Sequence, residues 1–94
     1  MPPDPRHVVS IEFCVPCDFR QQALELTKEL LVGWAQDISE LRLIPSAGGR
    51  FEVSLDGELV FSKAARGRHS EPGEVAKLVE ARIGSPAGQV IASA

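Results

Sequence analysis

The sequence predicts an α/β fold in which the elements follow the order β-α-β-β-β-α and form a four-stranded mixed sheet. Three observations carry this prediction: apolar and polar residues alternate over residues 7–13, the spacing becomes helical after Pro16, and an Asp-Gly pair separates two short apolar runs. At 94 residues, with 44% hydrophobic and 24% charged residues, the chain has the size and composition of one globular domain.

The first strand is expected over His7–Phe13, because apolar and polar side chains alternate there and most of the apolar ones are β-branched or aromatic. The first helix is expected over Pro16–Val32, where apolar residues recur at intervals of three and four. These residues are Phe19, Ala23, Leu26 and Leu30. Gly33 is expected to end the helix.

The second strand is expected over Glu40–Ile44, with Pro45 as its end. Strand, helix and strand in succession favour a parallel pair of strands joined by a right-handed crossover. The isomer of the peptide bond before Pro45 stays open, since most X–Pro bonds are trans but cis bonds occur almost only before proline.

A β-hairpin is expected over residues 51–62, because Asp56-Gly57 readily adopts the positive φ angles of a type I′ turn. A two-residue turn would place Val53 opposite Val60, with apolar residues on both faces of the hairpin. We therefore expect a sheet that is partly covered on both sides.

The last helix is expected from about Glu71 to Ile83, with Ser70 as its N-cap, Pro72 in its first turn and Gly84 at its end. Lys63–His69 is expected to be a loop. Residues 1–6 and 85–94 are expected to be flexible, which leaves residues 7–84 as the folded domain.

The charge and the hydropathy of the chain bound its environment. The formal net charge is -3, which predicts no long-range attraction to nucleic acid or to an anionic membrane. No run approaches the ~20 apolar residues that a membrane span needs, and the start MPPDPRH lacks the features of a secretory signal. The expected location is the cytoplasm, where a C-x-x-C pair is more often reactive or metal-binding than structural.

The candidate catalytic residues are Cys14 and Cys17, which lie where the first strand gives way to the helix. A helix N-terminus stabilises a thiolate, and two intervening residues let the sulfurs reach bonding distance. A zinc site usually takes four ligands, and the chain adds only His7 and His69, at spacings that match no zinc signature. No metal and no cofactor are expected, although adventitious zinc on the reduced pair and two inert packing thiols remain alternatives.

The order of elements, with both cysteines just after the first strand, is an abbreviated thioredoxin-like arrangement. Over roughly residues 7–84 the chain also resembles the selenoprotein W-like (Rdx) family, related to selenoproteins T and H, in CVPC, in IPSAGGRFEVSLDGELVFSK from Ile44 to Lys63, and in the final helix. The resemblance implies a thioredoxin-like fold and a thiol-based role in cell redox homeostasis. In many members the position of Cys17 holds selenocysteine, so this chain looks like a cysteine-only form.

Which cysteine attacks first stays open. Thioredoxin-like proteins generally use the N-terminal thiol, here Cys14, whereas the resemblance points to Cys17. The segment Lys63, Arg66, Arg68 and His69 is basic; it is either simply solvated or able to hold a glutathione carboxylate or an acidic partner. It also departs from relatives that show an aromatic residue after the glycine at Gly67.

The leading hypothesis is a thiol–disulfide oxidoreductase that acts on a protein thiol or disulfide or on glutathione. The alternative is a non-enzymatic redox-sensing adaptor, whose binding to a partner protein depends on the oxidation state of the same pair. A third class is a structural interaction domain that does not need its cysteines. A monomer or a weak dimer is expected, since an exposed sheet edge permits but does not require self-association.

Overall fold

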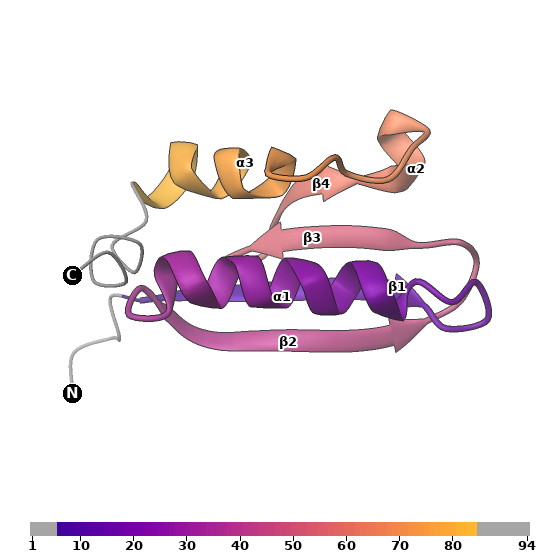
Figure 1. The fold of residues 1–94 in the computed structure, drawn as a ribbon, viewed down its shortest axis with the longest axis horizontal. Coiled ribbons are helices and arrows are strands. Elements are labelled where there is room, and N and C mark those ends of the chain that lie inside the picture. Colours follow the sequence, from indigo (N-terminus) through magenta and orange to yellow (C-terminus); the bar gives the residue numbers. More distant parts are fainter. Residues whose placement is uncertain (1–5, 85–94) are drawn as a thin grey trace.

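A computed structural model describes residues 6–84 of the chain, and Figure 1 shows its elements in order. The flexible ends expected at 1–6 and 85–94 lie outside the described residues, apart from Arg6. The elements are β1 (His7–Cys14), α1 (Arg20–Trp34), β2 (Ile38–Ser46), β3 (Phe51–Leu55), β4 (Glu58–Ser62), α2 (Lys63–Arg66) and α3 (Glu74–Ile83).

The sheet is four-stranded and mixed, as predicted, with the strand order β2-β1-β3-β4. β1 runs parallel to β2 and antiparallel to β3, and β3 pairs antiparallel with β4. The central strand β1 therefore carries Cys14 at its C-terminal end, while β2 and β4 form the two edges.

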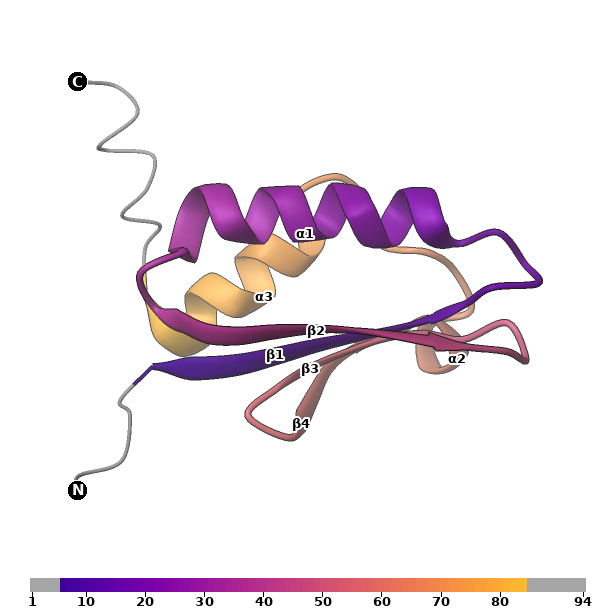
Figure 2. The same ribbon diagram turned by 90° about the horizontal axis from the view of Figure 1, so that it is seen from below.

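The two longer helices, α1 and α3, lie on the same face of the sheet (Figure 2). The prediction of a sheet covered on both sides is therefore wrong. On the opposite face the central strands carry polar residues, with Ser10 opposite Ser54 and Glu12 opposite Glu52. These four residues are half-buried; Oε1 of Glu52 accepts a hydrogen bond from the Ser62 hydroxyl at 2.9 Å, while its Oε2 is buried without a partner among residues 6–84.

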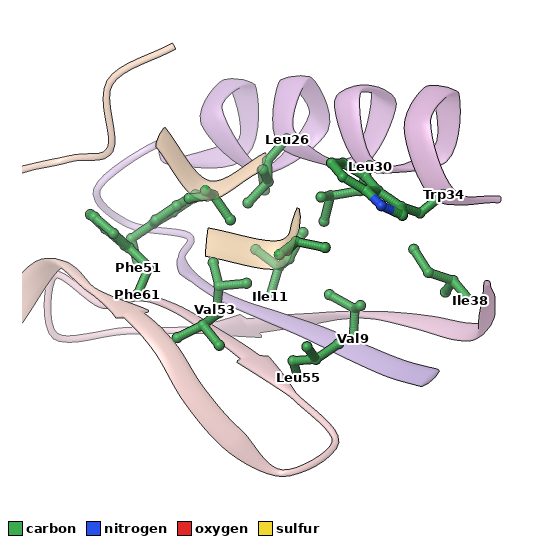
Figure 3. Close-up of a cluster of buried hydrophobic side chains, with 14 of the residues drawn as sticks. Val9, Ile11, Leu26, Leu30, Trp34, Ile38, Phe51, Val53, Leu55 and Phe61 are labelled. Carbon is green, nitrogen blue, oxygen red and sulfur yellow. The ribbon is translucent and has the colours of Figure 1, made fainter. Parts of the chain in front are cut away.

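The hydrophobic core fills the space between the sheet and the helices (Figure 3). Alternate residues of β1 and β3 point into it, because successive side chains of a strand face opposite sides. The fully buried members include Val9, Ile11, Leu30, Phe51, Val53, Val75 and Val79. Burial of this apolar surface is the main source of stability for the framework that holds the cysteines.

The predicted hairpin is confirmed, with positive φ angles of 53° at Asp56 and 84° at Gly57. The predicted pairing inside it is wrong, because a register shift after Val53 places Phe61 opposite Val53 and leaves Val60 as the extra residue of a bulge. A bulge lets two adjacent residues turn toward the core. Both Val60 and Phe61 are accordingly buried.

β2 is longer than predicted and continues through Pro45 to Ser46. Proline is tolerated there because β2 is an edge strand, where a missing N–H need not break a ladder. No peptide bond within residues 6–84 is cis, so the bond before Pro45 is trans.

The last two helices differ from the predictions at their starts. α3 begins at Glu74 with Gly73 as its N-cap, so Ser70 is not the cap and Pro72 precedes the helix. Gly84 ends α3, as predicted. The expected loop from Lys63 contains the short helix α2, whose N-cap is Ser62: its hydroxyl accepts a hydrogen bond from the N–H of Ala65 at 3.1 Å.

Candidate redox site

The two cysteines meet at the C-terminal end of β1, as the sequence predicts. They form a disulfide whose Cα atoms lie 5.3 Å apart, within the range typical of disulfides. Their environments differ: Cys14 is the last residue of β1 and is 0% exposed, whereas Cys17 lies exposed in the turn that follows. The N–H of Cys17 also lies 3.3 Å from Sγ of Cys14, in position to donate to it.

Backbone hydrogen bonds join the turn that carries the disulfide to the ends of the neighbouring strands. The N–H of Cys14 donates to the carbonyl of Arg50 at 2.8 Å, and the N–H of Val15 donates to the carbonyl of Ser46 at 2.9 Å. The N–H of Phe19 donates to the carbonyl of Cys14 at 3.1 Å, which closes the turn. These bonds hold the backbone on both sides of Cys17 against the sheet.

The start of α1 differs from the prediction, which placed it at Pro16. Asp18 has a φ of 61°, in the left-handed region, so the chain cannot be helical through this residue. α1 begins at Arg20, whose guanidinium donates to the Asp18 carboxylate at 2.8 and 3.0 Å. Cys17 thus lies three positions before the first helical residue, where the helix dipole acts less strongly than expected. At its other end α1 continues past Gly33 to Trp34.

An aromatic cluster that the sequence did not predict lies beside this turn. The rings of Phe19 and His69 meet edge to face with centroids 4.3 Å apart, and the Phe51 ring lies 5.4 Å from His69. Lys63 Nζ lies 5.5 Å from the centre of the Phe19 ring. Burial lowers the pKa of His69, and the nearby Lys63 charge lowers it further, which favours the neutral ring.

Two arginines of the basic segment pair with Glu74, the first residue of α3. Arg68 donates to both oxygens of Glu74, at 2.7 and 2.9 Å, and Arg66 lies 3.4 Å from the same carboxylate. These bonds, chiefly that of Arg68, lower the pKa of Glu74 to about 2. Arg66 also lies over the Phe61 ring at 5.3 Å. The segment is therefore ordered by its own ion pairs and ring contacts.

The two histidines considered as metal ligands lie in different parts of the fold. His7 begins β1, at the end opposite the cysteines, and its Nδ1 lies 2.6 Å from Oδ2 of Asp56. His69 packs on Phe19. Within residues 6–84, no three histidine, cysteine or acidic side chains gather in a way that could hold a metal ion.

The fold and the site define a thioredoxin-like α/β protein with a disulfide-forming C-x-x-C pair at the end of its central strand. The model of the Rdx family matches residues 8–81. The chain belongs to the Rdx family, as the sequence resemblance predicted.

Two mammalian proteins share sequence with the chain. It is 38% identical over 61 residues to the mouse protein Migration and invasion enhancer 1. The aligned region covers 65% of this chain and 50% of that protein. The bovine protein of the same name is 38% identical over 66 residues, covering 68% and 56%. The chain thus spans about half the length of the curated relatives it matches.

Two solved bacterial structures share the fold. A selenoprotein W-related protein from Vibrio cholerae superimposes with a TM-score of 0.76 at 25% identity, covering 81% of this chain and 95% of that one. A protein from Bordetella parapertussis gives a TM-score of 0.79 at 23% identity, covering 83% and 99%. Together with the Cys14–Cys17 disulfide, membership of the Rdx family supports a redox-type function. Within residues 6–84, no helix has both the length and the apolar character needed to cross a membrane.

Proposed function

We propose that the chain is a thiol–disulfide redox protein in which Cys14 and Cys17 cycle between disulfide and dithiol. The observation that carries this proposal is the disulfide itself, closed between one exposed and one buried residue at the end of the central strand. A buried structural disulfide would leave neither residue open to attack. Here an incoming thiolate can approach Cys17.

The asymmetry of the pair supports distinct roles for the two thiols. Cys17 is exposed and is the residue that attacks, or is attacked by, the substrate sulfur. Cys14 is fully buried and resolves the mixed disulfide from inside the turn. The N–H of Cys17, 3.3 Å from Sγ of Cys14, is in position to stabilise negative charge on Cys14 when the disulfide opens.

The exchange balances as a two-electron reaction. A substrate thiolate attacks Sγ of Cys17, a new S–S bond forms, and the electron pair of the broken disulfide leaves on Sγ of Cys14. A second substrate thiol then releases Cys17 as a thiolate and completes the substrate disulfide. The same steps run in reverse when reduced protein meets a substrate disulfide. Protein thiols and glutathione are the substrates that we propose, in the cytoplasm.

The test is a redox titration in glutathione buffers, in which free thiols are trapped by an alkylating agent and the products are weighed. We expect one two-electron transition between about -180 and -270 mV, the range of exchange catalysts and reversible sensors. A pair that resists both oxidation and alkylation in the folded protein would contradict the proposal.

The roles of the two cysteines are tested by single variants. Cys14→Ser leaves the exposed thiol and should be alkylated at least about tenfold faster than Cys17→Ser, which leaves the buried one. Equal rates would contradict the assignment. Turnover of a disulfide substrate with a reductant would identify an oxidoreductase, whereas oxidation-dependent binding without turnover would identify a redox-sensing adaptor.

A further inference from the structure

The outer side of β2 is a free sheet edge, because β2 is the first strand in the order β2-β1-β3-β4. The carbonyl of Ser46 accepts a bond from Val15, so the backbone of Ser46 faces the interior of the sheet. Backbone groups alternate sides along a strand, and those of Leu41, Leu43 and Pro45 therefore face outward. In the part of the chain that the structure describes, no strand pairs with them.

Exposed apolar side chains gather at the end of this edge that adjoins the disulfide. Leu43 is 40% exposed and Ile44 is 42% exposed, and they lie on opposite faces of the sheet, since they pair with Ile11 and Glu12. Val15, 41% exposed, is bonded to Ser46 and lies two residues before Cys17. Figure 1 shows the turn after β1 beside the tip of β2. The edge thus offers backbone groups flanked by apolar side chains, next to the exposed cysteine.

We propose that the free edge of β2 docks an extended, cysteine-containing segment of a partner polypeptide, which pairs antiparallel with Leu41–Pro45 and presents its cysteine to Cys17. This inference rests on the proposed function and names the substrate class of the same site. β2 runs toward the disulfide, so an antiparallel segment has its cysteine on the N-terminal side of the residues that pair. Main-chain bonds supply the affinity, and apolar side chains on the segment cover Leu43 and Ile44.

The charges along this edge indicate an uncharged partner segment. Glu40 and Arg42 lie on the same face of β2 and bond to each other at 3.0 Å, so they cancel locally. No charged side chain on the segment is needed to neutralise them. A small charged thiol such as glutathione also reaches Cys17 but gains nothing from the edge.

A second copy of the chain fits this edge less well than an unrelated strand. Symmetric antiparallel pairing centred on Leu43 would place Pro45 of each copy opposite Leu41 of the other, and Pro45 has no N–H to donate. The same register sets Arg42 opposite Ile44. Pairing centred on Leu41 avoids both conflicts, but it separates Leu43 and Ile44 of one copy from Leu43 and Ile44 of the other. An unrelated segment faces a single Pro45, whereas a symmetric pair of copies contains two, and its own sequence is not constrained by that of β2.

The chemical step on the docked segment is the balanced exchange described above. The cysteine thiolate of the segment attacks Sγ of Cys17 and forms a mixed disulfide, while the Cys14–Cys17 bond breaks and its electron pair leaves on Cys14. A second thiol of the partner then displaces Cys17 and leaves the partner oxidised by two electrons. With a partner disulfide and the reduced pair, the same steps run backward.

The test compares a peptide thiol with glutathione as reductants of the oxidised protein. The peptide carries one cysteine at its N-terminal end, followed by alternating valine and serine. We expect it to react about tenfold faster than glutathione, the gain from burying one leucine-sized side chain. Leu43→Lys should remove that advantage by lowering the rate with the peptide, without lowering the rate with glutathione. Leu59→Lys, on the other edge strand with Leu59 53% exposed, is the matched control and should alter neither rate.

Two altered peptides test the pairing without altering the protein. N-methylation at alternate residues removes backbone donors, and moving the cysteine to the C-terminal end reverses the required direction; each should lower the rate to that of glutathione. The inference would be overturned if either altered peptide reacted as fast as the first peptide. It would also be overturned if Leu43→Lys lowered the rates with the peptide and with glutathione equally. A dimer that Leu43→Lys dissociates in sedimentation would overturn it as well, because it would assign the edge to a second copy. No exchange with either thiol in the unaltered protein would overturn the proposed function itself.

Discussion

Both ends of β1 carry hydrogen bonds between segments far apart in the sequence, but only the C-terminal end also carries a covalent link. At the N-terminal end, the N–H of His7 donates to the carbonyl of Asp37 at 2.8 Å, and the Asp56 carboxylate accepts the N–H of Val8 at 2.9 Å. Nearby, the indole N–H of Trp34 donates to the carbonyl of Gly84 at 2.8 Å. Each of these bonds joins segments far apart in the sequence. We call this the closed end.

At the C-terminal end, which we call the site end, the Cys14–Cys17 disulfide is added to the backbone hydrogen bonds. It joins residues three apart, and the aromatic contacts of Phe19 with His69 lie beside it. A disulfide can be opened by exchange, whereas hydrogen bonds between distant segments depend only on the fold. Because such bonds hold both ends of β1, we expect opening of the disulfide to leave the fold intact.

The largest expected effect comes from breaking the closed end. Trp34 is buried in the core, so Trp34→Ala should lower the free energy of unfolding by about 3–5 kcal/mol. Trp34→Phe keeps most of the apolar volume and loses the bond to Gly84, so it should cost about 1 kcal/mol. Urea unfolding measures both. The alkylation rate of reduced Cys17 should stay unchanged, and a large rise would show that the two ends are not independent.

Reducing the disulfide should have a smaller effect. Its loop is short, and chain-entropy arguments give about 2 kcal/mol for such a loop. The reduced protein should therefore unfold cooperatively at a lower urea concentration and keep its circular dichroism spectrum. The double variant Cys14→Ser/Cys17→Ser is the control, which a reductant should not affect. Loss of structure on reduction would mean that the site end depends on its disulfide.

The sheet was largely predictable from the sequence, because local patterns determine its strands, whereas the bonds of the closed end join distant segments and were not predicted. Alternation located β1, β3 and β4, and Asp56-Gly57 located the turn. The bulge at Val60 was not predictable, since it is decided by which of two adjacent apolar residues the core accepts opposite Val53. The extension of β2 past Pro45 was also not predictable, because a proline is acceptable there only if the strand lies at an edge of the sheet, and the sequence does not show which strands are edges.

The sequence predicted that Cys14 and Cys17 come within bonding distance, but not the geometry around them. The spacing of apolar residues predicted that α1 begins at Pro16. That spacing carries no information on the left-handed backbone of Asp18 or on the hydrogen bond from the N–H of Phe19 to the carbonyl of Cys14. The contacts of His69 with Phe19 and Phe51 join three distant segments, which no local pattern reports. α2 is only four residues long, too short to show periodicity, although a serine at Ser62 and a glycine at Gly67 were usable capping signals.

The difference between the ends should also appear as a difference in pH dependence. The pKa of His69 is lowered from its ordinary value of 6.5, chiefly by burial. The unfolded chain therefore takes up this proton at a higher pH than the folded chain, and stability falls as pH drops from about 6.5 toward the folded value. His69→Phe keeps an aromatic ring against Phe19 and should remove this part of the slope in urea unfolding between pH 7 and pH 5. An unchanged slope would contradict the assignment.

The smallest effect is expected from the ionised group of the closed end. The hydrogen bond to His7, followed by that to Val8, lowers the pKa of Asp56 from 3.8, so its carboxylate stabilises the folded state above that pH. This contribution is lost as pH falls through 3.8 and then through the lower folded value. Because the Asp56 side chain is half exposed, Asp56→Asn should cost less than about 1 kcal/mol at pH 7.

Asparagine makes this variant a clean probe of the charge, since it tolerates the left-handed φ of 53° and keeps an oxygen for the N–H of Val8. The difference between Asp56→Asn and the unaltered protein should therefore be present at pH 7 and disappear near pH 2, as measured by urea unfolding. A difference that persists at low pH would assign the loss to the turn rather than to the carboxylate.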